Sequence, residues 1–263
     1  MKHKAKKKFG QNFLIDEYII NQIISYINPS DAHTNIEIGP GLGAITNIVL
    51  NYVEELKAIE IDPDVINKLK NPKLTIYNND VLELDFNQFK QENKKLKIFG
   101  NLPYNIATAI MIKMTDYAND IESMCFMVQK EVADKIIESS KQSRLKIFME
   151  YHFDIYKILE IPPQAFEPPP KVDSALIYLK PKQIKDKKCD SINILTQVTK
   201  QAFSMKRKTI KNNLKTFISA AELETININP ATRPEEITIK EYIEIANFIN
   251  SKRKKDNGQL LHR

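Results

Sequence analysis

Apolar and polar positions along the chain follow two different periods, and these periods predict where strands and helices lie. Short apolar runs rich in β-branched and aromatic residues, bounded by polar or proline positions, are typical of buried strands. Such runs occur at residues 34–38, 55–61, 74–77, 97–100, 123–129, 155–161 and 174–180. Stretches with apolar residues three or four positions apart predict helices that bury one face. They occur at residues 44–51, 64–70, 107–117, 130–138 and 145–152.

The first helix is predicted by its two ends as well as by its period. Asp16 is a typical N-cap residue, and Asn28-Pro29 ends the helix because proline cannot continue it. The apolar face between these ends consists of Ile19, Ile20, Ile23, Ile24 and Ile27. We therefore expect this helix to pack against the first layer of the fold.

The order of these elements indicates the fold class. Strands that alternate with helices predict a parallel sheet covered on both faces. The last two strands are joined by the proline-rich residues 162–171 without a helix, so we expect an antiparallel pair at the sheet edge. Helical periods return at residues 192–203, 209–218 and 239–250. We predict an α/β domain at residues 1–180, a polar linker at 181–190 and an all-helical domain at 191–263.

The charge of the chain is unevenly distributed. Lysine and arginine number 39 against 33 acids, which gives a net charge of +6. Residues 1–15 hold five lysines and no acid, and residues 171–215 hold twelve basic residues and three acids, whereas residues 16–100 hold thirteen acids and eight basic residues. Two basic regions around an acidic middle favour a polyanionic partner at the ends and a small ligand between them.

Other global features bear on the compartment. The chain has no apolar run of membrane-spanning length, no signal-peptide h-region and only two cysteines. We expect a cytoplasmic protein with no membrane partner. The four histidines are scattered and form no metal-ligand spacing with the cysteines, so we expect no metal site.

A glycine-rich loop follows the first strand of the predicted sheet, where such folds bind nucleotide-like ligands. Gly39 and Gly41 also fit the fingerprint of dinucleotide-binding dehydrogenases, but Pro40 removes a backbone N–H that a pyrophosphate would need. At the ends of the next two strands, Glu60 is placed to accept from ribose hydroxyls and Asp80 from an adenine amino group. The combination predicts S-adenosylmethionine as the cofactor.

The run Asn101-Leu102-Pro103-Tyr104 follows the buried strand at 97–100. Pro103 pushes Leu102 toward an extended backbone, which leaves the Leu102 carbonyl as a fixed acceptor. The Asn101 side-chain oxygen is a second acceptor, and Tyr104 offers a flat face beside both. Two acceptors and a ring suit the exocyclic amine of adenine, because hydrogen bonds from both of its hydrogens favour a pyramidal, nucleophilic nitrogen.

With these residues in view, the chain resembles the KsgA (RsmA) family of ribosomal RNA adenine dimethyltransferases nearly from end to end. The motifs that carry the resemblance are Lys8-Phe9-Gly10-Gln11-Asn12-Phe13-Leu14, the loop 37–46, Glu60-Ile61-Asp62, Asn101-Leu102-Pro103-Tyr104-Asn105, Gln129-Lys130-Glu131-Val132-Ala133, Phe166-Glu167-Pro168-Pro169-Pro170-Lys171-Val172-Asp173-Ser174-Ala175 and Lys206-Arg207-Lys208-Thr209. Met205 departs from the family, which commonly has a polar residue there.

The resemblance implies a Rossmann-like class I S-adenosylmethionine-dependent methyltransferase sheet with a small C-terminal all-helical domain. It implies N6,N6-dimethylation of two adjacent adenines in the loop of the 3′-terminal hairpin of 16S rRNA, during small-subunit biogenesis. It also implies that Phe166 stacks on the target base opposite Tyr104. The cofactor-site residues implied in this way, together with Gly41 of the glycine loop, are Asn12, Leu14, Gly39, Glu60, Asp80 and Asn101.

Three alternatives remain open from the sequence. They are a large-subunit rRNA methyltransferase of the erythromycin-resistance type, a DNA adenine methyltransferase, and a ribosome-assembly or transcription factor that kept the fold but lost catalysis. The helical C-terminal part and the 166–175 motif favour the KsgA family over the first two, and the intact site residues argue against the third. We expect a monomer whose basic residues Lys206, Arg207, Lys208 and Lys211 hold RNA phosphates.

Overall fold

The computed structural model describes residues 11–183 and 188–260, and the chain divides into two compact units. The sheet unit comprises Met1–Glu138 and His152–Pro181, and the helical unit comprises Ser139–Tyr151 and Lys182–Arg263. The lysine-rich residues 1–10 and residues 184–187 of the expected linker lie outside the described residues. The division differs from the sequence-based one in two respects: residues 139–151 group with the helical unit, and the expected linker at 181–190 is not separate, since the boundary falls between Pro181 and Lys182.

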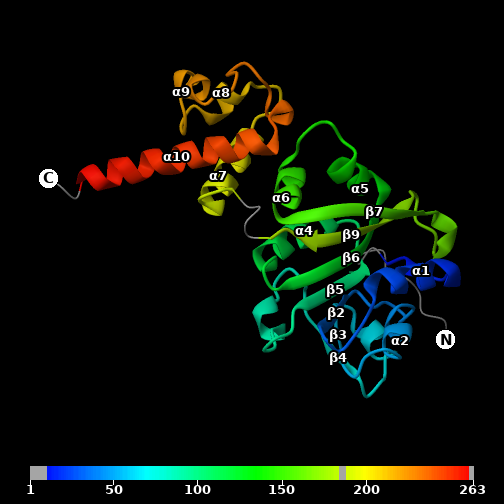
Figure 1. Cartoon of the computed structure of the whole chain (residues 1–263). Coiled ribbons are helices and arrows are strands. Elements are labelled where there is room, and N and C mark those ends of the chain that lie inside the picture. Colours follow the sequence, from blue (N-terminus) through cyan, green and yellow to red (C-terminus); the bar gives the residue numbers. More distant parts are fainter. Residues whose placement is uncertain (1–10, 184–187, 261–263) are drawn as a thin grey trace. The chain divides into compact units, whose positions relative to one another are not determined.

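The sheet unit is built on seven strands in the order β4-β3-β2-β5-β6-β9-β7, which lie side by side in Figure 1. Neighbours from β4 to β6 pair in parallel, and β9 pairs antiparallel with both β6 and β7. The strands are β2 (Thr34–Ile38), β3 (Leu56–Ile59), β4 (Leu74–Tyr77), β5 (Leu96–Asn101), β6 (Ile121–Gln129), β7 (Phe153–Ile161) and β9 (Ser174–Pro181).

All seven strands predicted from the apolar runs are confirmed, each to within two residues at either end. The predicted antiparallel pair is also confirmed, and it places β7 at the sheet edge. Two further strands were not predicted. β1 (Phe13–Leu14) and β8 (Phe166–Glu167) form a separate two-stranded sheet, with Leu14 opposite Phe166. Two residues carry too little pattern to reveal a strand.

The apolar face of α1 (Glu17–Ile27) packs on one side of the sheet, as predicted. The Asp16 carboxylate accepts from the Ile19 N–H at 3.0 Å and so caps the helix. Asn28 ends it in the left-handed conformation, with a φ of 45°. The core on this side contains residues from α1, α2, β5, β6 and β9. Since strand side chains alternate between faces, the fully buried Ile98 and Phe126 belong to the other face, so both faces are covered.

The other helices of the sheet unit are shorter than the sequence predicts. The predicted helices at 44–51 and 64–70 are single helical turns in the structure, and the rest of each stretch is turn or irregular backbone. The α-helices are α2 (Thr46–Val49), α3 (Pro63–Ile66), α4 (Ala107–Met114) and α5 (Lys130–Ile137), and the 3-10 helices are η2 (Phe86–Phe89), η3 (Thr115–Tyr117) and η4 (Pro163–Ala165).

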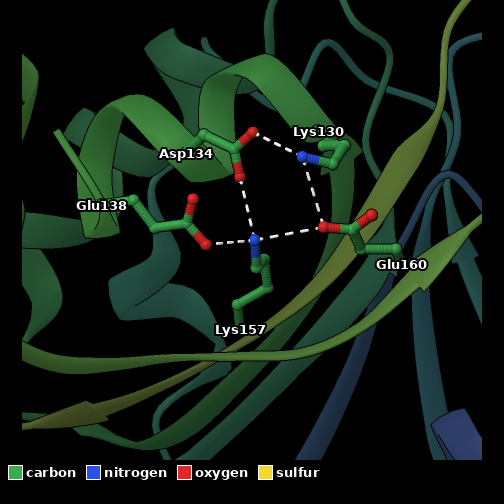
Figure 2. A network of polar contacts seen from close by, with 5 residues as sticks. All are labelled: Lys130, Asp134, Glu138, Lys157 and Glu160. Carbon is green, nitrogen blue, oxygen red and sulfur yellow. Dashed lines mark hydrogen bonds and ion pairs between the residues drawn. The ribbon is translucent and has the colours of Figure 1, made fainter.

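A network of charged side chains ties α5 to the edge strand β7 (Figure 2). The Lys157 ammonium contacts the carboxylates of Asp134 at 3.0 Å, Glu160 at 3.2 Å and Glu138. The Lys130 ammonium contacts Asp134 at 2.8 Å and Glu160 at 3.2 Å. These bonds to lysine hold the pKa of Asp134 and of Glu160 below the usual range. Charged residues on an edge strand also oppose pairing with other chains.

The helical unit has its own core, which includes Ile147 and Tyr151 of α6 (Arg144–His152). These contacts explain why residues 139–151 group with it. Its remaining helices are α7 (Ile192–Ala202), α8 (Ile210–Leu214), α9 (Ala220–Thr225), η6 (Pro234–Glu236) and α10 (Ile239–Leu260). The sequence analysis missed α9, although Ser219 and Glu222 form a capping box at its start. Among the described residues, no helix is both long and apolar enough to span a bilayer.

Candidate active site

The carboxyl ends of β2, β3 and β5 converge on one hollow, and the glycine loop after β2 forms part of its wall. Gly39 has a φ of 69°, and a Cβ added to it would lie 3.5 Å from the backbone oxygen of Asn101. At Gly100, a Cβ would lie 2.1 Å from the Ile38 carbonyl oxygen. Glycine at position 100 therefore permits the close approach of β2 and β5, whereas at position 39 it permits the left-handed backbone that begins the loop.

This main hollow has about 810 Å³ of space outside the protein atoms, open solvent included. Of the predicted site residues, those that line it are Asn12, Leu14, Gly39, Gly41, Glu60, Asn101, Leu102, Pro103 and Tyr104. Asp80 lines a neighbouring side hollow with Ile61, Val81, Pro103 and Ile106. The two hollows share Gly39, Glu60, Ile61 and Pro103. The structure thus brings the predicted cofactor residues together around one composite space.

The two acids predicted at successive strand ends are held by backbone groups. One carboxylate oxygen of Glu60 accepts from the Asp62 N–H at 2.9 Å, and burial raises the pKa of Glu60. One carboxylate oxygen of Asp80 accepts from the Leu82 N–H at 2.8 Å. Within the described residues, Asp80 is fixed at one oxygen and keeps the other for a ligand. Glu60 also accepts from the backbone N–H groups of Ile61 and Gly41, and these hydrogen bonds oppose the rise in its pKa.

A third acid, Glu37 in β2, also lines the main hollow, and the sequence analysis did not assign it a role. Only 1% of Glu37 is exposed, and its carboxylate accepts from the Thr46 hydroxyl at 2.7 Å. Burial raises its pKa to about 7, the Thr46 hydrogen bond opposes that rise, and the nearby Glu60 charge adds to it. An acid inside an otherwise apolar strand run was the signal that could have revealed it.

Asn101 ends β5 with its side-chain amide in a fixed orientation. The Asn101 Nδ2 donates to the backbone oxygen of Asn12 at 2.9 Å, which leaves Oδ1 as the acceptor. The carbonyl oxygen of Leu102 accepts no hydrogen bond within the described residues, whereas the next carbonyl, of Pro103, accepts from the N–H groups of Ile106 and Ala107. Two acceptors that have no donor among the described residues therefore lie on adjacent residues of the hollow's wall.

The Tyr104 ring stands at the same wall and is held by its hydroxyl. That hydroxyl lies 2.7 Å from the Ser174 hydroxyl, and Ser174 is fully buried at the start of β9. Burial raises the pKa of Tyr104, so the phenol is neutral at physiological pH. The 166–175 motif thus touches the site through Ser174, a contact that the sequence analysis did not foresee.

Phe166, predicted to stack on the target base, is a buried residue in this structure. Its side chain is only 2% exposed and belongs to the core cluster that includes Leu14, its partner across the β1–β8 pair. It is not among the residues of either hollow. The ring is therefore packed as a core residue in this structure, and its stacking on a base opposite Tyr104 stays a prediction.

The predicted basic residues lie in the helical unit. Lys206, Arg207 and Lys208 occupy the connection between α7 and α8, and Lys211 is on α8. All four are exposed, and none of them makes an ion pair within the described part of the chain.

A β3-β2-β5 core of parallel strands, with a glycine loop and acids at the strand ends, defines the protein as a class I methyltransferase by fold. The chain belongs to the family described as ribosomal RNA adenine dimethylase, whose model matches residues 2–251. The enzymes of this family are rRNA adenine dimethyltransferases.

Several known proteins are similar to the chain over most of its length. "Ribosomal RNA small subunit methyltransferase A" from Shewanella sp. (strain MR-7) is 43% identical over 258 residues, which is 95% of this chain and 96% of that protein. The dimethyladenosine transferase from Plasmodium falciparum has a TM-score of 0.75 at 21% identity and covers 91% of this chain and 98% of its own. The 23S rRNA methyltransferase ErmE has a TM-score of 0.68 at 21% identity and covers 91% of this chain and all of its own. These two structures share the fold.

Proposed function

We propose that this enzyme dimethylates N6 of two adjacent adenines in the loop of the 3′-terminal hairpin of 16S rRNA, with S-adenosylmethionine as methyl donor. The family and the 42–44% identity to small-subunit methyltransferases support the substrate. The observation that carries the chemistry is the Asn101 amide, which is tied to Asn12 through its nitrogen and presents its oxygen as an acceptor at the main hollow.

The donor set of the hollow fits this cofactor. Among the described residues that line the main hollow, none is lysine or arginine, whereas Glu37 and Glu60 supply carboxylates for a cationic ligand with ribose hydroxyls. Pro40 disfavours a pyrophosphate. When bound, S-adenosylmethionine supplies an electrophilic methyl group on a positively charged sulfur. The residues that would hold it are Asn12, Leu14, Gly39, Gly41, Glu60 and Asn101, with Asp80 at the adenine amino group.

The catalytic residues act on the target amine. The Asn101 oxygen and the Leu102 carbonyl accept hydrogen bonds from the two N–H groups of adenine N6, which favours a pyramidal nitrogen with an available lone pair. Pro103 fixes the backbone directly after these acceptors, because its ring restricts its own φ and disfavours a helical conformation at Leu102. Tyr104 stacks on the flipped base, and the Ser174 hydroxyl holds the ring in place. Positioning then supplies most of the rate enhancement.

The remaining parts of the proposal concern the partner and the setting. Lys206, Arg207, Lys208 and Lys211 bind RNA phosphates, which positions the substrate without reading its sequence. We place the enzyme in the cytoplasm, where small subunits mature, with catalysis in the 1–180 domain and RNA binding in the 191–263 domain. The monomeric state stays a prediction. The 23S rRNA methyltransferase ErmE shares the fold, so the fold does not distinguish a small-subunit substrate from a large-subunit one. Methylation assays on both RNAs distinguish them.

The test follows methyl transfer to a small-subunit precursor and to 23S rRNA, with the modified bases identified by mass spectrometry. We expect dimethyladenine in the 16S hairpin. Asn101→Ala should slow both transfers by about 100-fold at saturating cofactor, because one preorganised acceptor is lost from the transition state. Asn101→Asp is the matched variant, since it keeps an acceptor oxygen but cannot donate to Asn12. Modification of 23S rRNA alone would refute the substrate, and a full rate in Asn101→Ala would refute the role of Asn101.

A further inference from the structure

The connection between α7 and α8 has an unusual backbone at its basic centre. Arg207 has a φ of 65°, in the left-handed region. The other non-glycine residues with positive φ in the described chain are all asparagines, namely Asn28, Asn93 and Asn227. Asparagine tolerates this conformation by local hydrogen bonding, whereas for arginine it costs on the order of 1 kcal/mol or more. An arginine at this position therefore indicates that its side chain is needed there.

A buried amide fixes the start of this connection. Asn213 on α8 is fully buried, and its Nδ2 donates to the carbonyl oxygen of Ala202 at 2.7 Å and to that of Met205 at 3.4 Å. Its own backbone oxygen accepts from the Gln201 side chain at 3.0 Å. Ala202 is the last residue of α7, so Asn213 satisfies a helix-end carbonyl and holds the chain just before the basic residues.

The Asn213 side chain is retained at an energetic cost. Its Oδ1 is buried without a hydrogen-bond partner in the described structure. A buried acceptor left unpaired costs about 1 to 3 kcal/mol, so a leucine of similar size would be favoured if only packing mattered. The amide is therefore explained by what its nitrogen does, which is to set the path of residues 202–205.

The residues that follow are open to a ligand. Positions 205–208 are exposed, and none of their backbone N–H groups donates a hydrogen bond within the described residues. Successive free N–H groups in a turn bind anions, and here three of the four residues, Lys206, Arg207 and Lys208, are basic. A phosphate is the anion that matches this set of donors, because guanidinium groups bind it in a bidentate manner.

We propose that Asn213 is a positioning residue that holds the α7–α8 connection in the turn which presents Lys206, Arg207 and Lys208 to RNA phosphates. The inference rests on the proposed function, since it takes RNA as the ligand. It adds that the affinity for RNA depends on where the turn places Arg207, so that the net charge of the turn alone does not determine this affinity.

The first test measures binding of a fluorescent 16S 3′-hairpin RNA by anisotropy as salt is raised from about 50 to 200 mM. Asn213→Leu should bind more weakly, with a log–log slope shallower by at least about 0.7, the value for one phosphate contact. One contact corresponds to about a threefold smaller loss of affinity over this salt range. Tyr242→Phe is the control, because it removes a buried hydrogen bond to the Pro234 carbonyl in the same unit and should leave the slope unchanged. A folded Asn213→Leu protein with the wild-type slope would overturn the proposal.

A second variant tests placement without touching Asn213. In the double variant Ser204→Arg, Arg207→Asn the net charge is unchanged, and asparagine is suited to the left-handed position. Ser204 is exposed, so this protein should fold even where Asn213→Leu does not. We expect its slope to be shallower by about one contact, and an unchanged slope would overturn the proposal. The methylation assay on the same RNA is independent of both tests: binding with the expected slopes but no methyl transfer would refute only the proposed function.

Discussion

Glu37→Gln should stabilise the ligand-free protein at alkaline pH and have little effect at acidic pH. Burial raises the pKa of Glu37 from 4.5 to about 7, so the folded protein favours the protonated, neutral form. The stabilisation from that proton is complete below pH 4.5 and is lost as the pH rises through 7. Glutamine mimics the neutral form at every pH and can still accept from the Thr46 hydroxyl at 2.7 Å.

The size of the effect follows from the pKa difference. A rise from 4.5 to about 7 corresponds to about 3 kcal/mol, at about 1.4 kcal/mol per pKa unit. Most of this develops between pH 5 and 8. For a protein of this size, about 3 kcal/mol corresponds to roughly 6 to 12 °C in the thermal midpoint. Solvent screens the Glu37 charge little, because only 1% of the residue is exposed, so the full free-energy difference is expected.

The assay is thermal unfolding from pH 5 to 8.5, followed by circular dichroism for wild type, Glu37→Gln and the control Glu83→Gln. Glu83 is exposed, so the control removes the same charge without a buried site. We expect the difference between Glu37→Gln and wild type to grow with pH and that of the control to stay near zero. A constant difference across the range would show that Glu37 is ionised at all these pH values and would refute the reasoning.

Three further predictions address the site and the scaffold. Gly39→Val should abolish binding of S-adenosylmethionine in isothermal titration while the protein stays folded, because a branched side chain is strained at a φ of 69° and fills the wall beside Asn101; unchanged affinity would remove the loop from the site. Ser174→Ala should lower kcat more than cofactor affinity, because it releases the Tyr104 hydroxyl. In a Tyr104→Phe protein the same Ser174 substitution should be nearly neutral, and an equal loss of kcat in the wild-type and Tyr104→Phe proteins would contradict this coupling. Lys157→Met should lower the thermal midpoint at pH 7 but much less near pH 3. The pKa values of Asp134 and Glu160 are lowered in the folded protein, so the network stabilises the fold above their usual pKa and this stabilisation is lost as the carboxylates are protonated. A decrease in the midpoint that is independent of pH would assign Lys157 a packing role only.

The strands of the sheet could be predicted from sequence because each is a buried run with a clear apolar pattern. The single-turn helices α2 and α3 were overestimated, since apolar residues in loops near a core follow a helical period without forming helix. The grouping of residues 139–151 depends on contacts of Ile147 and Tyr151 with helices distant in sequence. No local pattern contains that information.

In the site, too, features set by local sequence could be predicted, whereas contacts between residues distant in sequence could not. The glycine loop and the acids at strand ends could be located, because parallel strands bring their carboxyl ends to one edge. The bond from Asn101 to Asn12 joins residues 89 positions apart, and the bond from Tyr104 to Ser174 joins residues 70 apart. The burial of Phe166 is also non-local: its motif gives the residue type, whereas its place in the core comes with the pairing of β8 to β1.

Glu37 connects the stability of the fold with the chemistry of the site. Its carboxylate and that of Glu60 line one hollow, and each is buried, so ionisation of both is unfavourable while the hollow contains only water. A ligand that carries positive charge reverses this balance, because it stabilises the ionised form of both acids at once. We therefore predict that Glu37, which weakens the ligand-free fold at neutral pH, also favours the proposed sulfonium-bearing cofactor over a neutral analogue. A stabilising glutamine at position 37 would be expected to lose part of that preference.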